Sequence, residues 1–216
     1  MRGWKKERII RVPLNHPDGS LSMYRIAKEA ETHHSWAIKV IKRLQKKGFL
    51  KKTEVTDANG LFNYWLENHK KPEYRDYNVR APVELLKKAK NQNLEFALTT
   101  YSAENSVQKY LFLSRYDIYV KDLEKWHNLA MEDGVRGGGN FRVLYNFDPH
   151  VFYKSYTPGI KLHADKEKPP EFSISIFPVV STPQLILDLL EEGGPCKEAA
   201  ELLIKKNYGG KDVRKD

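Results

Sequence analysis

Two short amphipathic segments, separated by a tight turn, limit the possible folds of this chain more than any other feature. Behind Ser22, apolar residues recur at the three- and four-residue spacing of a capped helix: Met23, Ile26, Ala27 and Ala30. After residues 31–33, a second segment over residues 34–47 repeats this spacing with Ala37, Val40, Ile41 and Leu44, and Gly48 follows as a helix stop. The pattern predicts two helices that bury their apolar faces in one core.

The sequence on either side of this pair extends the pattern. Residues 4–12 predict a further helix that ends at Pro13. Beyond Gly48 the apolar period changes to two, so residues 50–55 and 61–66 read as strands around a turn at Asn59-Gly60, a pair typical of tight hairpins. Helix, helix, turn, helix and basic hairpin is the order of a winged helix-turn-helix. Glu31 departs from it, because a glycine commonly stands at that point of the turn.

The positive charge lies in the same part of the chain. The 216 residues include 37 Lys and Arg against 28 Asp and Glu, a net charge of +9. Residues 1–80 hold 18 against 9, or +9, whereas residues 81–216 hold 19 against 19 and balance. This asymmetry predicts a basic module that meets a polyanion. Nucleic acid is the first candidate and an anionic membrane surface the second, while a solvated lysine-rich surface without a partner is the third.

Composition excludes several classes of protein. With 40% apolar and 12% aromatic residues, the chain is too rich in core-forming side chains to be disordered. No apolar run approaches the roughly 18 residues of a membrane span, and the N-terminus has no apolar signal core, so we expect a cytoplasmic protein. The single cysteine, Cys196, cannot form an internal disulfide, and no Cys/His cluster has zinc-site spacing.

Helical geometry selects candidate DNA contacts. With the apolar stripe turned inward, the outer face of the second helix carries His34, Ser35, Lys39, Lys42, Arg43 and Lys46. Such a helix reads bases from its N-terminal turns, so His34, Ser35 and Lys39 are candidates for base edges. Lys42, Arg43 and Lys46 suit phosphates, which position the protein without specifying sequence. In the predicted hairpin, Lys51, Lys52 and Asn59 would reach the backbone or the minor groove. A winged helix that serves as a scaffold for protein partners is the alternative.

The remainder of the chain predicts a second module. The polar residues 68–81 read as a linker between residues 1–67, the DNA-binding domain, and residues 82–210. In that second part, helical patterns over residues 82–90, 103–110, 122–131, 182–190 and 196–206 alternate with strands at 94–99, 117–120, 141–145 and 172–180, and residues 151–153 read as extended. The expected fold is therefore α+β: an N-terminal winged helix-turn-helix followed by a mixed α/β C-terminal domain.

Four phrases in this second module carry a family resemblance. Residues 96–105 (FALTTYSAEN), 117–120 (DIYV), 138–144 (GGNFRVL) and 178–190 (PVVSTPQLILDLL) resemble the AbiEi-type antitoxins of type IV toxin–antitoxin systems. The resemblance implies a prokaryotic autorepressor that binds repeats upstream of its own operon. It also implies an antitoxin role against a co-encoded nucleotidyltransferase-like toxin, without a stable complex between them. A stand-alone homologue with only the regulatory role fits equally well.

One recognition helix covers little sequence, so we expect paired sites on double-stranded DNA and a homodimer or cooperative binding. Catalysis, a cofactor and a bound metal are not expected. The glycines at residues 137–139 are not followed by the Gly-Lys-Ser/Thr of a phosphate loop, and adjacent His33 and His34 have no third ligand for a metal. The alternative is a metal-dependent nuclease or nucleotidyltransferase that uses the winged helix to bind substrate, with Asp165 and Glu167 as its carboxylates.

Overall fold

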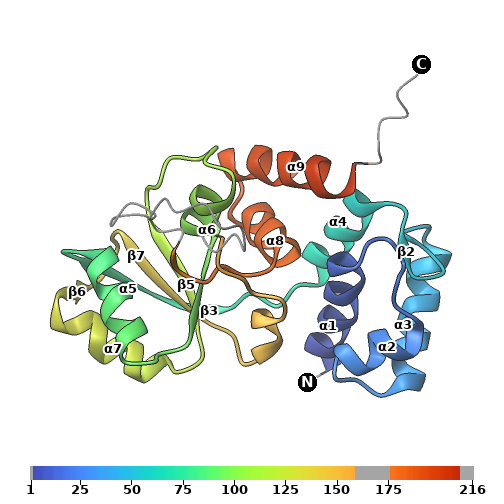
Figure 1. The fold of residues 1–216 in the computed structure, drawn as a ribbon, viewed down its shortest axis with the longest axis horizontal. Helices are drawn as coiled ribbons and strands as arrows, with labels where there is room; N and C mark the ends of the chain where they lie inside the picture. Colours follow the sequence, from blue (N-terminus) through green and yellow to red (C-terminus); the bar gives the residue numbers. More distant parts are fainter. Residues whose placement is uncertain (1, 159–175, 210–216) are drawn as a thin grey trace, which may run out of the picture. The chain divides into compact units, whose positions relative to one another are not determined.

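The computed structural model describes residues 2–158 and 176–209, and the chain divides into two compact units (Figure 1). The first unit combines residues 1–70 with residues 182–216, and the second comprises residues 71–181. The expected domain layout therefore needs correction, because the helices after residue 181 join the N-terminal unit. No local sequence pattern predicts that residues 182–216 pack with residues 1–70, because this packing depends on side chains more than 100 positions apart.

Three helices begin the first unit: α1 (Arg2–Asn15), α2 (Met23–Glu29) and α3 (His34–Lys46). The Ser22 side chain caps α2 by accepting a hydrogen bond from the Arg25 amide, as the sequence predicts. Between α2 and α3, Glu31 adopts the left-handed backbone conformation with φ of 50°, which explains why a glycine is common there. Its carboxylate pairs with Arg8 of α1 at 2.6 Å. Helix α1 continues through Pro13 for a further two residues, so the predicted stop was wrong.

The segment after α3 differs from the predicted hairpin. The strands β1 (Leu50–Lys51) and β2 (Glu54–Val55) pair with each other around a turn in which Lys52 has a φ of 56°. Residues 61–66 are not a strand, because they lie in the helix α4 (Ala58–Asn68). The helix is capped by Asp57, whose carboxylate accepts a hydrogen bond from the Gly60 amide at 2.8 Å. The helix forms instead of the predicted strand because helical spacing buries Leu61, Phe62 and Trp65 together on one face.

Two C-terminal helices, α8 (Thr182–Glu192) and α9 (Pro195–Tyr208), complete the first unit. Helix α8 contacts α1, α4 and α9. The ring of Phe62 meets Tyr208 edge-to-face at 5.5 Å, and the Tyr208 hydroxyl donates a hydrogen bond to the Leu14 carbonyl at 2.8 Å. Through Tyr208, the end of α9 packs against α1 and α4.

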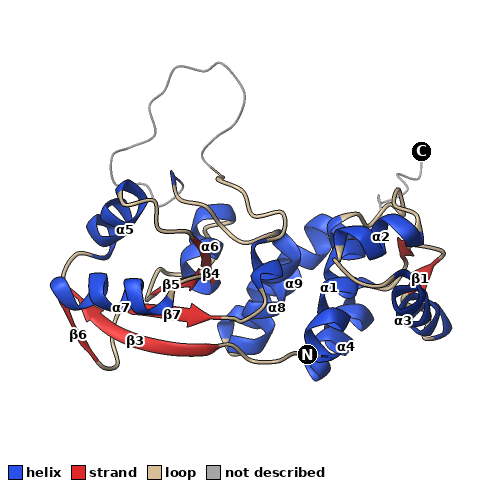
Figure 2. Ribbon diagram, turned by 90° about the horizontal axis from the view of Figure 1, so that it is seen from below, coloured by secondary structure: helices blue, strands red, loops and turns tan. Residues whose placement is uncertain are grey.

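The second unit is a mixed α/β unit built on a five-stranded sheet within the described residues (Figure 2). Its strands lie in the order β4 (Phe96–Thr99), β5 (Tyr116–Val120), β7 (Phe141–Tyr145), β3 (Glu73–Val79) and β6 (Gly134–Arg136). Strands β5 and β7 are parallel, and the other neighbours are antiparallel. The helices are α5 (Pro82–Asn91), α6 (Thr100–Val107), α7 (Leu123–Glu132) and the short 3-10 helix η1 (Pro149–Phe152).

Strand β3 occupies half of the predicted linker over residues 68–81. Its composition is polar, but Tyr77 and Val79 point into the core while Asp76 forms a two-fold ion pair with Arg142 of β7. Strand β3 lies between β7 and β6, but most of its residues are polar. The alternation of buried and exposed side chains that marks a strand was therefore not visible in the sequence.

Aromatic packing forms the core of this unit. The buried Trp126 of α7 lies 5.2 Å from the ring of Phe96 and 6.4 Å from that of Phe141. Two predictions on the later part of this unit change. Residues 151–153 are largely 3-10 helix. Of the strand predicted over residues 172–180, residues 172–175 lie outside the described residues, and in the remainder Val179 forms isolated bridges with Leu98 and with Tyr156.

Candidate nucleic-acid interface

Helix α3 separates into two chemically distinct faces. Ala37, Val40, Ile41 and Leu44 are buried, as the apolar spacing predicts. The opposite face exposes all six residues selected from the sequence: His34, Ser35, Lys39, Lys42, Arg43 and Lys46. The helix contains no Asp or Glu, so its outer face carries four cations and no anion. The asymmetry of charge also holds for the compact units, since the first has 21 Lys and Arg against 14 Asp and Glu, or +7, and the second has 16 against 14, or +2.

The hairpin adds two further cations beside α3. Lys51 lies on β1 and Lys52 in the turn, and both side chains are exposed. The Gln45 side-chain amide donates a hydrogen bond to the Lys52 carbonyl, which holds the turn against α3. Within the described part of the chain, the side chains of Lys39, Lys42, Arg43, Lys46, Lys51 and Lys52 form no ion pair. Their charge is therefore available to an external anion.

Asn59 does not belong to this group. It is exposed in the first turn of α4 rather than in a hairpin turn. There it lines a pocket of about 580 Å³ together with Asp57, Glu201 and Lys205. The Asn-Gly pair was a misleading signal, because Asp57 uses the Gly60 amide to start a helix.

Contacts that the sequence did not reveal organise the first turn of α3. The ring of Tyr24, from α2, meets that of His34 at a centroid distance of 5.5 Å and an angle of 64°. The Nδ1 atom of His33, the N-cap residue of α3, lies at hydrogen-bond distance, 2.8 Å, from Ser35 Oγ. The apolar spacing of α2 leaves Tyr24 outward, but only the packing of α2 on α3 places it beside His34.

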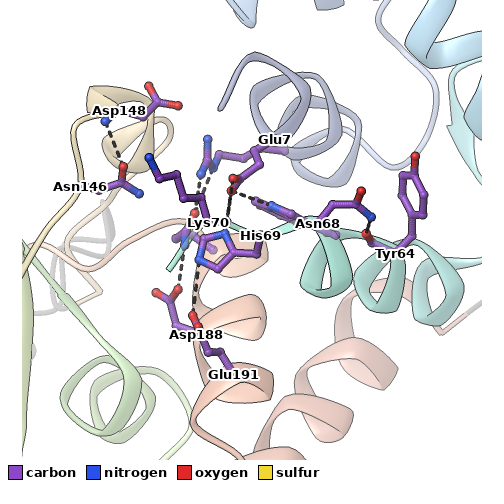
Figure 3. Close-up of polar contacts among 12 residues, drawn as sticks. Glu7, Tyr64, Asn68, His69, Lys70, Asn146, Asp148, Asp188 and Glu191 are labelled. Carbon is purple, nitrogen blue, oxygen red and sulfur yellow. Dashed lines mark hydrogen bonds and ion pairs between the residues drawn. The ribbon is translucent and has the colours of Figure 1, made fainter. Parts of the chain in front are cut away.

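A buried polar network lies elsewhere in the first unit, among α1, the end of α4 and α8 (Figure 3). The Glu7 carboxylate accepts hydrogen bonds from the Trp65 indole at 3.1 Å and from the Lys70 amide at 3.1 Å. His69 lies between two acids, with Nδ1 2.7 Å from Glu7 and Nε2 3.4 Å from Glu191. The second contact has the distance of an ion pair but not the angle of a good hydrogen bond.

The charge of His69 follows from this environment. Burial lowers its pKa, but the contacts with Glu191 and Glu7 outweigh burial and raise the pKa to about 9. Below this pH, His69 is a cation that neutralises part of the buried acidic charge. Beside it, Arg11 donates two hydrogen bonds to Gln184, whose amide donates to Asp188. The network therefore joins α1, the end of α4 and α8, and sequence reasoning missed it because its members are distant in the chain.

Asp165 and Glu167, the carboxylates of the alternative metal-dependent enzyme, lie outside the described residues. The glycines at residues 137–139 form the connection between β6 and β7, where no helix begins. Among residues 2–158 and 176–209, no group of three or more His, Cys, Asp or Glu side chains could hold a metal ion. None of the described helices has the length and apolar character needed to cross a membrane.

No protein-family model matches the chain, and a search of curated proteins and of solved structures likewise finds no match.

Proposed function

We propose that the first unit is a winged helix-turn-helix that binds double-stranded DNA and that the protein is a transcriptional regulator. The observation that carries this proposal is the outer face of α3, which exposes four cations and no acid. Helices α2 and α3 would form the helix-turn-helix and the hairpin β1–β2 a short wing. Lys51 and Lys52 on this wing extend the cationic surface beyond α3.

The mechanism would be occupancy of a promoter. Lys42, Arg43 and Lys46 would meet phosphates and set the register of the protein on the duplex. His34, Ser35 and Lys39, on the N-terminal turns of α3, would contact base edges in the major groove. Protein bound at paired sites, as a homodimer or cooperatively, would then block transcription.

The family resemblance supplies the biological setting of this proposal. A regulator of AbiEi-antitoxin type would repress its own operon, and the second unit would serve pairing of the protein on DNA or antitoxin activity against a nucleotidyltransferase-like toxin. The same residues allow a regulator without a toxin. Such a protein would act in the cytoplasm of a prokaryote, without a cofactor and without catalysis.

The test is binding of the full chain to a duplex from its own upstream region, against a scrambled duplex of equal length. We expect tighter binding to the first duplex, and loss of that preference in Lys39→Ala/Arg43→Ala with the DNA left intact. Lys90→Ala/Lys197→Ala, which removes two exposed lysines outside α3 and the hairpin, is the matched control. Equal binding of the two duplexes would refute a sequence-specific regulator. Cleavage on addition of magnesium would instead favour the metal-dependent nuclease.

A further inference from the structure

Tyr24 is an exposed aromatic residue with a defined contact. It lies in the first turn of α2, where 63% of its surface is accessible, while Ile26 and Ala27 supply the buried face of the same helix. Its ring contributes little to the core. Its ring meets the imidazole of His34, the first residue of α3, edge to face.

This contact matters because of where His34 stands. An exposed imidazole at the start of a helix can occupy several rotamers, and each would present its nitrogens in a different direction. An edge-to-face partner at 5.5 Å favours one orientation of the ring. The hydroxyl of the neighbouring candidate, Ser35, lies at hydrogen-bond distance from the His33 imidazole. The side chains of His34 and Ser35 are thus arranged before any ligand arrives.

We infer that Tyr24 is a positioning residue that sets the sequence selectivity of the interface by holding the His34 imidazole for contact with a base edge. The inference rests on the proposed function, and it adds a residue that does not itself read DNA. A side chain fixed in its binding orientation loses less rotamer freedom on binding, and this gain applies only to the sequence that His34 recognises. A phosphate contact from the Tyr24 hydroxyl would instead strengthen binding to every sequence.

The experiment measures the ratio of affinities for the upstream duplex and the scrambled duplex. We expect Tyr24→Phe to keep the wild-type ratio, because the ring remains. Tyr24→Ala should lower the ratio by about 2- to 10-fold, the range expected for loss of one aromatic pair. In a His34→Ala background, Tyr24→Ala should cause no further loss, since its partner is gone. Tyr110→Ala removes an exposed tyrosine of the second unit and is the control.

Two outcomes among the variants would overturn the inference while leaving the proposed function intact. One is an unchanged ratio in Tyr24→Ala together with a reduced ratio in His34→Ala. The other is an equal loss of affinity for both duplexes in Tyr24→Phe and Tyr24→Ala, which would assign the hydroxyl to a phosphate. Failure of the proposed function would be visible in the wild-type protein, which would then bind both duplexes equally. In that case there would be no sequence selectivity to which Tyr24 could contribute. Thermal unfolding should show that Tyr24→Ala remains folded, with at most the small loss of stability expected from one exposed aromatic pair.

Discussion

The substitution His69→Gln removes the buried cation between Glu7 and Glu191. In the folded protein the pKa of His69 is about 9, whereas an unfolded histidine titrates near 6.5. At about 1.4 kcal/mol for each pH unit, this difference corresponds to about 3 kcal/mol of stability. Because the folded pKa is the higher one, this stabilisation is complete below about pH 6.5 and disappears as the pH rises through about 9.

The assay is urea unfolding of wild type and His69→Gln across this range of pH. Near pH 6 the variant should be less stable by about 3 kcal/mol or more, since Glu7 and Glu191 lose their buried cation. Near pH 9.5 most of this difference should be gone, because the wild-type His69 is then largely neutral as well. His34→Gln, on the exposed face of α3, controls for replacing a histidine. A difference between wild type and His69→Gln that stays constant with pH would refute the reasoning.

Three further predictions address the fold and the interface. Asp57→Ala removes the cap of α4 and should lower stability by about 1 kcal/mol in thermal unfolding, whereas Asn59→Ala in the same turn should change it little. Gly139→Ala would bring a Cβ atom to 2.4 Å from the Tyr77 carbonyl and should cost about 1–3 kcal/mol by urea unfolding, while Gly138→Ala meets nothing within 4 Å and should be neutral. Lys52→Ala should weaken binding of any duplex about fivefold at about 0.15 M salt through loss of one phosphate contact, and Asn59→Ala, which lies on α4, should not. An equal loss of duplex affinity in Lys52→Ala and Asn59→Ala would contradict this prediction and indicate that Asn59 contacts DNA.

The inner face of α3 and the elements of the second unit from α5 to α7 largely follow from sequence, because one period dominates each of those segments. Ala37, Val40, Ile41 and Leu44 fit only a helical spacing. The apolar side chains of residues 61–66 fit both the two-residue period of a strand and the period of a helix. A helix forms because Asp57 caps it and because Phe62 and Trp65 are buried in the first unit.

The parts that sequence did not predict depend on distant partners. The buried network needs α8 beside α1, and this contact brings Gln184 to Arg11 across 173 positions. The polar residues of strand β3 resemble a linker in sequence, because the partner of Asp76, Arg142, is distant in the chain. At the candidate interface, the outward residues of α3 were selected correctly as exposed. The contact of His34 with Tyr24 emerges only from the packing of α2 on α3, and the contact of Ser35 with His33 arises locally at the start of α3.

The salt dependence of DNA binding tests the central claim most directly. If Lys42, Arg43, Lys46, Lys51 and Lys52 each neutralise one phosphate, the logarithm of the binding constant should fall with the logarithm of salt concentration with a slope of about −4 to −5. In Lys42→Ala/Arg43→Ala the slope should become shallower by about 2, while the preference for the upstream duplex persists. A slope that does not change in this variant would contradict the account, because the cationic face of α3 would then not be the surface that meets DNA.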